Sequence, residues 1–394
     1  MSAAADAVII GGGIMGLFCA HELVQQRLGR VILLEKRFCG AGSSGKSGAI
    51  LRQHYSHRTT ILMARESLSF YRTLKERTGR DIGFRPAPMV LLCHERERAS
   101  IESNISLQRS FGVAVEMLDA RQLRELEPRG EFGDEVVGAV ESESGFVDPG
   151  RTIDALASLC RDDHVDLREG VRVIDVLLDK SHRARGVQTD DGQTIESPLV
   201  INAGGPWAGI LCKRLGLQMP LKVIRPQQAY FVLPGGHGSE HFIFADLLTG
   251  FYWKPEAAGW TRVGRMSYED DEEVPDPDKY DEGVSGSFVD SCRRGIAHRL
   301  PAYHHAVSWG GCGALYTVTP DAHALIGEVP GIAGFYVVSG FSGHGFKMGP
   351  AVGKGVASMI TGCDPGGFDR EFFDVDRFAA QQAITTSYRF GILG

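Results

Sequence analysis

The strongest constraint on the fold lies near the N-terminus, where a glycine triplet separates two short apolar runs. Residues 8–10 and residues 31–34 are each long enough to form one buried strand. Between them, Gly11, Gly13 and Gly16 have the G-x-G-x-x-G spacing, and apolar residues follow at helical intervals. Strand, glycine turn, helix and strand in this order predict the first βαβ unit of a dinucleotide-binding fold.

Each part of this unit has a physical role in binding a dinucleotide. The glycines permit a tight turn, a close approach of pyrophosphate to the backbone, and close packing of helix on strand. The helix that starts at Ile14 and Met15 presents backbone N–H groups to an anion. Glu35 follows the second strand, 19 residues beyond Gly16, near the separation of about 20 expected for a ribose-binding acid. An ordinary glycine-rich turn is the alternative.

Composition narrows the class of protein. The net charge of -7 argues against nucleic acid or an anionic membrane as the main partner. No apolar run approaches the length of a membrane-spanning helix, so we expect a cytoplasmic protein. The eight cysteines have no C-x-x-C or zinc spacing and are expected to be reduced. We interpret His304 and His305 as a surface pair and predict no metal site.

The rest of the chain alternates helices, strands and glycine turns. We expect helices over residues 60–78, 100–111, 152–160 and 350–360, and strands over residues 89–93, 137–140 (an edge strand), 171–176, 199–202, 229–232, 242–244, 251–253 and 261–264. Residues 190–192 predict a hairpin turn, and the acidic run 269–273 predicts a solvated loop. Glycine turns after the strands near residues 202 and 339 give two later places where a backbone can approach a nucleotide.

With these residues assembled, the chain resembles the flavin amine oxidoreductases of the D-amino acid oxidase superfamily. The resemblance covers nearly the whole chain and is carried by residues 202–207, by Y-T-V-T-P-D at 316–321 and by F-S-G-H-G-F-K at 341–347. It is greatest to monomeric sarcosine oxidase, the sarcosine oxidase β subunit and dimethylglycine dehydrogenase.

The resemblance implies an α/β (α+β) fold of two domains that are interleaved in sequence. A Rossmann-type domain, formed by residues 1–87, 145–221 and 322–394, would bind FAD. An antiparallel-sheet domain, formed by residues 88–144 and 222–321, would cover the substrate.

The resemblance also implies roles for individual residues. Arg52 and Lys347 fall where the substrate carboxylate is held, and both groups suit a carboxylate; a structural ion pair and a snorkelling lysine are the alternatives. Tyr252 and Tyr316 fall in the lining of the substrate cavity, unless they are core aromatics. Besides the first glycine turn and Glu35, we assign to the cofactor Lys36, Ser43, Ser44, Val173, Ala203, Gly204, Gly205, Trp207, Gly343, His344, Gly345, Phe346 and Lys347.

Two departures from the family pattern concern how flavin is attached. The cysteine that carries flavin covalently in monomeric sarcosine oxidase aligns with Ala314, and Cys312 lies two positions away. The histidine that carries a second flavin in the β subunits falls near Pro149. We therefore expect non-covalent FAD and no FMN.

A third departure concerns the reaction with oxygen. The family lysine that promotes this reaction aligns with Thr261 or Arg262, and the active-site histidine beyond it becomes Met266 (or Arg265). We assign Arg262 to the catalytic group because it keeps a positive charge, and Lys254 is a second candidate. The electron acceptor, oxygen or a quinone-type carrier, stays open.

These features predict an FAD enzyme that oxidises the C–N bond of an amino acid or N-alkyl amino acid to an imine. Two alternatives remain: a 2-hydroxy acid dehydrogenase on the same fold, and a non-catalytic FAD-binding subunit of a larger complex. The sequence leaves the substrate side chain, its chirality and the oligomeric state undetermined.

Overall fold

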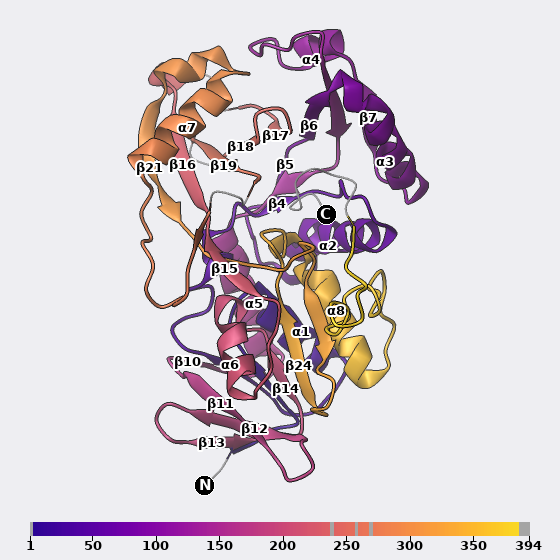
Figure 1. Cartoon of the computed structure of the whole chain (residues 1–394), viewed down its shortest axis with the longest axis vertical. Coiled ribbons are helices and arrows are strands. Elements are labelled where there is room, and N and C mark those ends of the chain that lie inside the picture. The colour runs from indigo at the N-terminus through magenta and orange to yellow at the C-terminus, as the bar shows by residue number, and fades with distance from the viewer. Residues whose placement is uncertain (1–2, 237–239, 257–258, 268–270, 386–394) are drawn as a thin grey trace.

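The computed structural model describes residues 3–236, 240–256, 259–267 and 271–385. Two large sheets lie at opposite ends of the molecule, with helices against both (Figure 1). The predicted α/β class is confirmed, because one sheet is mainly parallel and helix-covered while the other is mainly antiparallel.

The mainly parallel sheet contains six strands of the described chain. Its order is β10-β3-β2-β14-β24-β23, parallel except for the last pair. The inner strands β3, β2, β14 and β24 are short and mainly apolar because both faces of the sheet are covered, whereas the edge strand β10 is mainly polar. In sheet order the bounds are Asp166–Glu169, Val31–Glu35, Ala7–Ile10, Val200–Asn202, Phe335–Ser339 and Leu325–Glu328.

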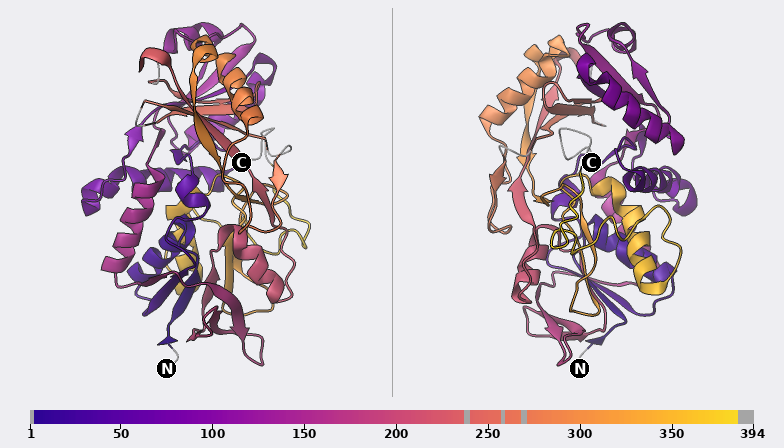
Figure 2. Two further views of the ribbon diagram at one scale, coloured as in Figure 1. Left: turned by 90° about the vertical axis from the view of Figure 1, so that its left-hand side faces the viewer. Right: turned by 45° about the vertical axis from the view of Figure 1, so that its right-hand side comes forward.

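Alternate residues of these strands enter two different cores. Ile9 and Leu33 pack on the side of helices α1 (Ile14–Gln25), α5 (Pro149–Asp162) and α8 (Gly349–Thr361), whereas Val8 and Ile32 pack on the side of a smaller sheet and helix α6 (Ala208–Arg214). Figure 2 gives two further views of the helices and sheets. The smaller sheet has the order β1-β13-β12-β11, and its β12–β13 pair confirms the predicted hairpin. These strands span Ala3–Ala4, Thr194–Glu196, Ala184–Thr189 and Val173–Leu178.

The second large sheet has eight strands within the described residues and lies at the top of Figure 1. Its order is β21-β16-β19-β18-β17-β6-β8-β7, and β17 pairs with β6 in parallel while the other neighbours are antiparallel. In sheet order the bounds are Val307–Gly313, Gln227–Val232, Thr261–Arg265, Phe251–Pro255, Ile243–Asp246, Met89–His94, Val136–Glu141 and Val115–Leu118.

The two faces of this sheet also differ. Met89 and Leu91 join the core shared with α1 and α8, while Val90 and Leu92 pack in a core closed by helix α7. The face that carries Met89 and Leu91 therefore lies toward the parallel sheet. A site between the two sheets is lined by residues of both sheets.

Helices and short strands connect the two large sheets. The helices are α1 Ile14–Gln25, α2 Arg58–Thr78, α3 Arg98–Ser110, α4 Ala120–Leu126, α5 Pro149–Asp162, α6 Ala208–Arg214, α7 Gly286–Ala297 and α8 Gly349–Thr361. The short strands are β4 Ile50–Leu51, β5 Arg85–Pro86, β9 Gly145–Phe146, β15 Lys222–Arg225, β20 Glu272–Glu273 and β22 Tyr316–Val318. The 3₁₀ turns are η1 Ser43–Lys46, η2 Glu95–Glu97, η3 Gly205–Trp207, η4 Pro234–Gly236, η5 Pro301–His305 and η6 Phe346–Met348.

Three expectations about elements are wrong. The strand expected at the sheet edge, β8, lies between β6 and β7, and β7 is the edge strand. Of the acidic run, Glu272 and Glu273 form strand β20, which pairs with β15, while residues 269 and 270 lie outside the described residues. Strand β11 begins at Val173, two residues later than expected, because Val171 bonds to Glu35 O instead of joining the ladder.

The strands divide between the sheets in an interleaved way, as the two-domain interpretation requires, and the exact domain boundaries stay a prediction. Among the described residues, no helix is long and apolar enough to cross a membrane. Within the same residues no cluster of three or more His, Cys, Asp or Glu side chains is arranged for a metal ion. All eight cysteines are free thiols.

Candidate active site

A cavity of about 290 Å³ runs along the ends of the parallel strands. Its wall includes the first glycine turn, Glu35 at the end of β3, the turn after β14 and the turn after β24. These are the carboxyl ends of neighbouring strands, where ligands bind in open α/β sheets. The N-terminal, middle and C-terminal segments thus meet at one site.

The glycine turn is shaped by close backbone contacts. A Cβ at Gly11 would lie 2.6 Å from the Ala203 carbonyl oxygen, and Gly11 has φ +107°. A Cβ at Gly16 would lie 1.9 Å from the Gly11 oxygen. Neither position tolerates another residue, so the turn keeps the N-terminus of α1 open toward the cavity. Ser44 Oγ accepts a bond from the Ile14 N–H at 3.0 Å and steadies that end.

Glu35 is anchored before any ligand binds. Its carboxylate accepts bonds from the Gly12 N–H at 2.8 Å and the Arg37 N–H at 2.9 Å. These bonds fix the side chain at the cavity wall, and its remaining lone pairs can accept hydroxyl groups. The arrangement fits the ribose of a dinucleotide.

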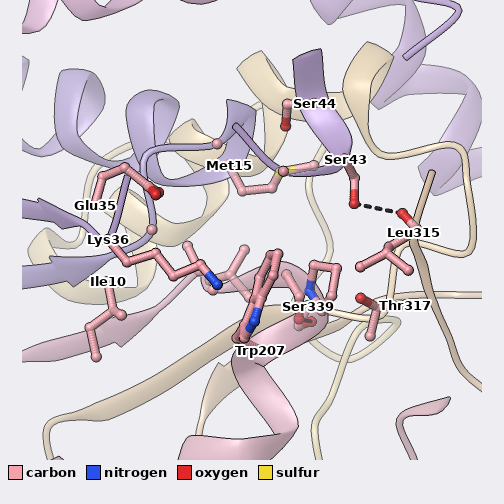
Figure 3. A pocket seen from close by; sticks show the side chains of 18 of the residues that line it. Ile10, Met15, Glu35, Lys36, Ser43, Ser44, Trp207, Leu315, Thr317 and Ser339 are labelled. Atoms are coloured by element: carbon pink, nitrogen blue, oxygen red, sulfur yellow. Dashed lines mark hydrogen bonds between the residues drawn. The ribbon is translucent and has the colours of Figure 1, made fainter. Parts of the chain in front are cut away.

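A loop from the second half of the chain closes the same end of the cavity. We call residues 276–283 the strap. Asp278 of the strap pairs with Lys36, accepts a bond from Arg172 at 3.2 Å and accepts one from the Trp207 indole at 3.1 Å. Figure 3 shows the Lys36 side chain beside Trp207, with its Nζ 3.5 Å from the ring centroid. The contributions of Asp278 and Arg172 were missed, because the sequence gives only a polar loop there.

A second cavity, of about 70 Å³, lies under the eight-stranded sheet. Ser47, Tyr316, Gly343 and Phe346 line both cavities, so the two spaces meet. Gly343 has φ +87°, and a Cβ there would lie 2.4 Å from the Tyr316 ring. The two motifs at residues 316–321 and 341–347 therefore pack together where the cavities join.

The second cavity carries two buried cations. Arg52 and Lys347 line it and are 5% and 8% exposed. The Arg52 guanidinium lies 4.1 Å from the Tyr55 ring centroid and donates to the His54 carbonyl oxygen. Burial and the nearby Arg52 lower the pKa of Lys347 well below its usual value, and Glu141 opposes this shift. The cations are brought together as predicted, and no acidic side chain is among the described lining residues.

The remaining walls are aromatic and apolar. Tyr252 stands over Gly264 on the neighbouring strand, where a Cβ would lie 2.6 Å from the tyrosine hydroxyl oxygen. Met266, 2% exposed, also lines the cavity, with Met89, Ile243 and other apolar residues. The wall of the second cavity is therefore positively charged at Arg52 and Lys347 and mainly apolar or aromatic over the rest of its surface.

The predicted oxygen-site residues lie outside both cavity walls. Arg262 Nε pairs with Glu256 at 2.5 Å, and its NH1 donates to the Ser47 carbonyl oxygen at 3.1 Å. Lys254, 1% exposed, pairs with the other oxygen of Glu256 at 2.9 Å. Burial lowers the pKa of Lys254 to about 8. Through the bond from Arg262 to Ser47, this network supports the cavity wall at Ser47. The catalytic role of Arg262 stays a prediction.

Most positions assigned to the cofactor line the large cavity. They are Gly11, Gly13, Ile14, Met15, Glu35, Lys36, Ser43, Ser44, Val173, Ala203, Gly204, Gly205, Trp207, Gly343, Gly345 and Phe346. Gly16 and His344 lie behind its wall, where His344 Nε2 lies 2.8 Å from the Ala322 carbonyl oxygen. Ser43 donates to the Leu315 carbonyl oxygen, as the dashed line in Figure 3 shows. Their roles toward a cofactor stay predictions.

The residues near the aligned attachment position agree with a cofactor held without a covalent bond. Ala314 is buried and has no reactive group. Cys312, on strand β21, has its Sγ 3.3 Å from the Tyr230 hydroxyl. Neither is among the described residues that line the large cavity.

Comparison with known proteins agrees with this geometry. The family model described as FAD dependent oxidoreductase matches residues 6–359. Peroxisomal sarcosine oxidase from Homo sapiens is 27% identical over 95% of this chain and 96% of its own length. The 4-methylaminobutanoate oxidase (formaldehyde-forming) of Paenarthrobacter nicotinovorans is 27% identical over 95% of this chain, which spans 46% of that longer protein.

Solved structures share the whole architecture. L-proline dehydrogenase from P. horikoshii superposes with a TM-score of 0.88 and 25% identity, covering 98% of this chain and 100% of that one. The arrangement of the two sheets is therefore shared with that structure.

Proposed function

This chain belongs to the FAD dependent oxidoreductase family, and from that membership we propose that it oxidises the C–N bond of an amino acid or N-alkyl amino acid to an imine. Water then hydrolyses the imine to a carbonyl product and an amine. The observation that carries the proposal is the junction of the large cavity at the strand ends with a second cavity holding Arg52 and Lys347.

The residues of the large cavity fit FAD. Glu35 suits the ribose, the N-terminus of α1 suits the pyrophosphate, and the wall from Gly343 to Phe346 suits the isoalloxazine. Bound there, FAD would supply hydride-accepting chemistry to the substrate carbon. The α8 N-terminus, just after Phe346–Met348, favours negative charge near that wall.

The second cavity orients the substrate. Arg52 and Lys347 suit a carboxylate, and the same two positive charges disfavour an ammonium group and so favour the neutral amine. Among the described lining residues none is Asp, Glu or His, so the substrate need only arrive as the neutral amine for its carbon to lose a hydride. The chain's part is therefore to orient the amine and to exclude water.

A second candidate function, oxidation of a 2-hydroxy acid, would use the same cations. This candidate is disfavoured because hydride loss from an alcohol requires a base to take the hydroxyl proton, whereas a neutral amine uses its nitrogen lone pair, and no Asp, Glu or His is among the described lining residues. We further propose a carrier such as a quinone rather than oxygen as the preferred acceptor, since the cations Lys254 and Arg262 are paired with Glu256 outside the cavity walls. We also propose a cytoplasmic location.

An anaerobic flavin-bleaching screen tests the proposed function. Purified protein is loaded with FAD and mixed with amino acids, N-methyl amino acids, opines and the matching hydroxy acids. Bleaching by carboxylated amines is the expected result. Bleaching by hydroxy acids alone would support the second candidate, and no bleaching by either class would support a non-catalytic FAD-binding subunit. Acid precipitation of the same protein should release the flavin.

A further inference from the structure

The cavity cations have a buried acidic neighbour on strand β8. Glu141 is the last residue of β8, pairs in register with Met89 of the cavity wall, and is 1% exposed. Its carboxylate accepts two contacts from the Gln53 N–H, at 2.8 and 3.0 Å, and one from the Gln53 amide at 3.3 Å. Gln53 follows Arg52 directly, so Glu141 is bonded to the backbone that carries one cavity cation.

We propose that Glu141 is the internal counter-ion of the substrate cavity, cancelling one of the two buried cations so that the cavity takes a single carboxylate. This inference rests on the proposed function and deepens it. With Arg52, Lys347 and Glu141 all charged, one positive charge remains for a ligand. Substrates with one carboxylate and an uncharged side chain match that balance, while dicarboxylates and basic amino acids do not.

The electrostatics of the cavity agree with this role. Burial lowers the pKa of Lys347, and Glu141 is the group that raises it again. Burial raises the pKa of Glu141, while its bonds from Gln53 and the charge of Arg52 stabilise the carboxylate. The charge of Lys347 is therefore favoured by Glu141, and the charge of Glu141 by Arg52 and by its hydrogen bonds.

The other titratable groups near these charges stay neutral around pH 7. Burial lowers the pKa of His54 to about 3 and that of His344 well below its usual value. Burial raises the pKa of Tyr55 and Tyr316 to about 12 each, and that of Tyr252 well above its usual value. A pH-dependent change in carboxylate binding is thus assigned to Lys347 and Glu141.

Glu141→Gln tests the proposal, because glutamine keeps the shape and can still accept from Gln53. Binding of acetate and propionate to the FAD-loaded variant and wild type is measured by flavin absorbance or calorimetry from about pH 6 to pH 9. Without the counter-ion the pKa of Lys347 falls further, so its charge is lost at lower pH. If the pKa of Lys347 falls by one, binding becomes up to about tenfold weaker than in wild type at pH values above both Lys347 pKa values, and is unchanged at pH values below both.

A pH-independent ratio of the two dissociation constants would overturn the proposal, because it would mean that Glu141 only positions the Gln53 backbone. Glu127→Gln is the matched control, since Glu127 is 2% exposed and pairs with Arg129, away from the cavity. The control should follow the wild-type pH profile.

A compensating pair keeps the proposal falsifiable if the single variant folds poorly. Lys347→Met leaves Arg52 and Glu141 as a neutral pair, so acetate binding should be lost. Adding Glu141→Gln restores one net positive charge. Acetate should then bind about tenfold more tightly to the double variant than to Lys347→Met alone. Weaker binding in the double variant than in Lys347→Met would overturn the proposal. If amines bleach the wild-type flavin, either failure leaves the proposed function intact.

Discussion

Arg52 and Lys347 are the side chains on which the proposed substrate class depends, because both are buried in the wall of the second cavity. Arg52→Ala and Lys347→Ala should each weaken binding of a carboxylate substrate by about 2–5 kcal/mol, the usual cost of removing one partner of a buried charged pair. The loss should be much smaller for the amide of the same substrate. Steady-state kinetics with the acid and its amide measures this difference, and equal losses would show that the residues serve only structure.

Glu35 gives a prediction for cofactor binding alone. Glu35→Ala removes a charged acceptor held at the end of β3, which should weaken FAD binding by about 1.5–3 kcal/mol. Fluorescence titration of the apoprotein with FAD measures the dissociation constant. Glu125→Ala is the control, since Glu125 lies on the surface of α4 in an ion pair with Arg121. An unchanged dissociation constant in Glu35→Ala would remove the ribose assignment.

Individual side chains differ in how far the sequence revealed them. Glu35 was predictable because its distance from the glycine turn is fixed by one βαβ unit. Asp278 and Glu141 were not, because each comes from a segment far along the chain and reaches the site only through pairing of distant strands and loops. A solvated acid and a buried counter-ion look alike in sequence.

Among the elements, the β18–β19 pair gives a steric prediction. Gly264→Ala places a methyl group where Tyr252 now stands, so the tyrosine must move in the substrate cavity. We expect a raised KM and an FAD affinity close to that of wild type, measured by kinetics and titration. Gly209→Ala in α6 is the control, because its Cβ would meet only Leu221 at 4.0 Å. An unaltered KM in Gly264→Ala would mean that Tyr252 does not contact substrate.

The elements themselves were largely predictable, but their places in the sheets were less so. The apolar patterns identified β2, β3 and the four strands β16 to β19. The pattern of apolar residues does not distinguish an edge strand from a covered one. Strand β7 has a half-polar sequence and was not predicted, yet it pairs with β8 and forms the edge of the sheet. The pairing of Glu272 and Glu273 with β15 likewise depends on tertiary contact, although both side chains are exposed to solvent as an acidic run prefers.

For the molecule as a whole, the strap joins distant parts of the chain over the cofactor cavity. Asp278→Ala removes its pairs with Lys36 and Arg172 and its bond from Trp207. Exposed pairs contribute only about 0–1 kcal/mol each, so we expect FAD to dissociate a few times faster, with the difference shrinking at high salt. Stopped-flow dissociation of FAD measures the rate. Lys279→Ala, at an exposed strap position, should match wild type. A salt-independent rate equal to wild type would mean that the strap does not retain FAD.

We propose that a carboxylated amine, held between Arg52 and Lys347, delivers its hydride to FAD in the adjoining cavity. A single anaerobic turnover tests this proposal: FAD-loaded enzyme is reduced by the best N-methyl amino acid, and the amine and carbonyl products are quantified against reduced flavin. The expected result is one amine and one carbonyl product per flavin reduced. Flavin reduction without release of an amine, or reduction only by the matching hydroxy acid, would contradict it.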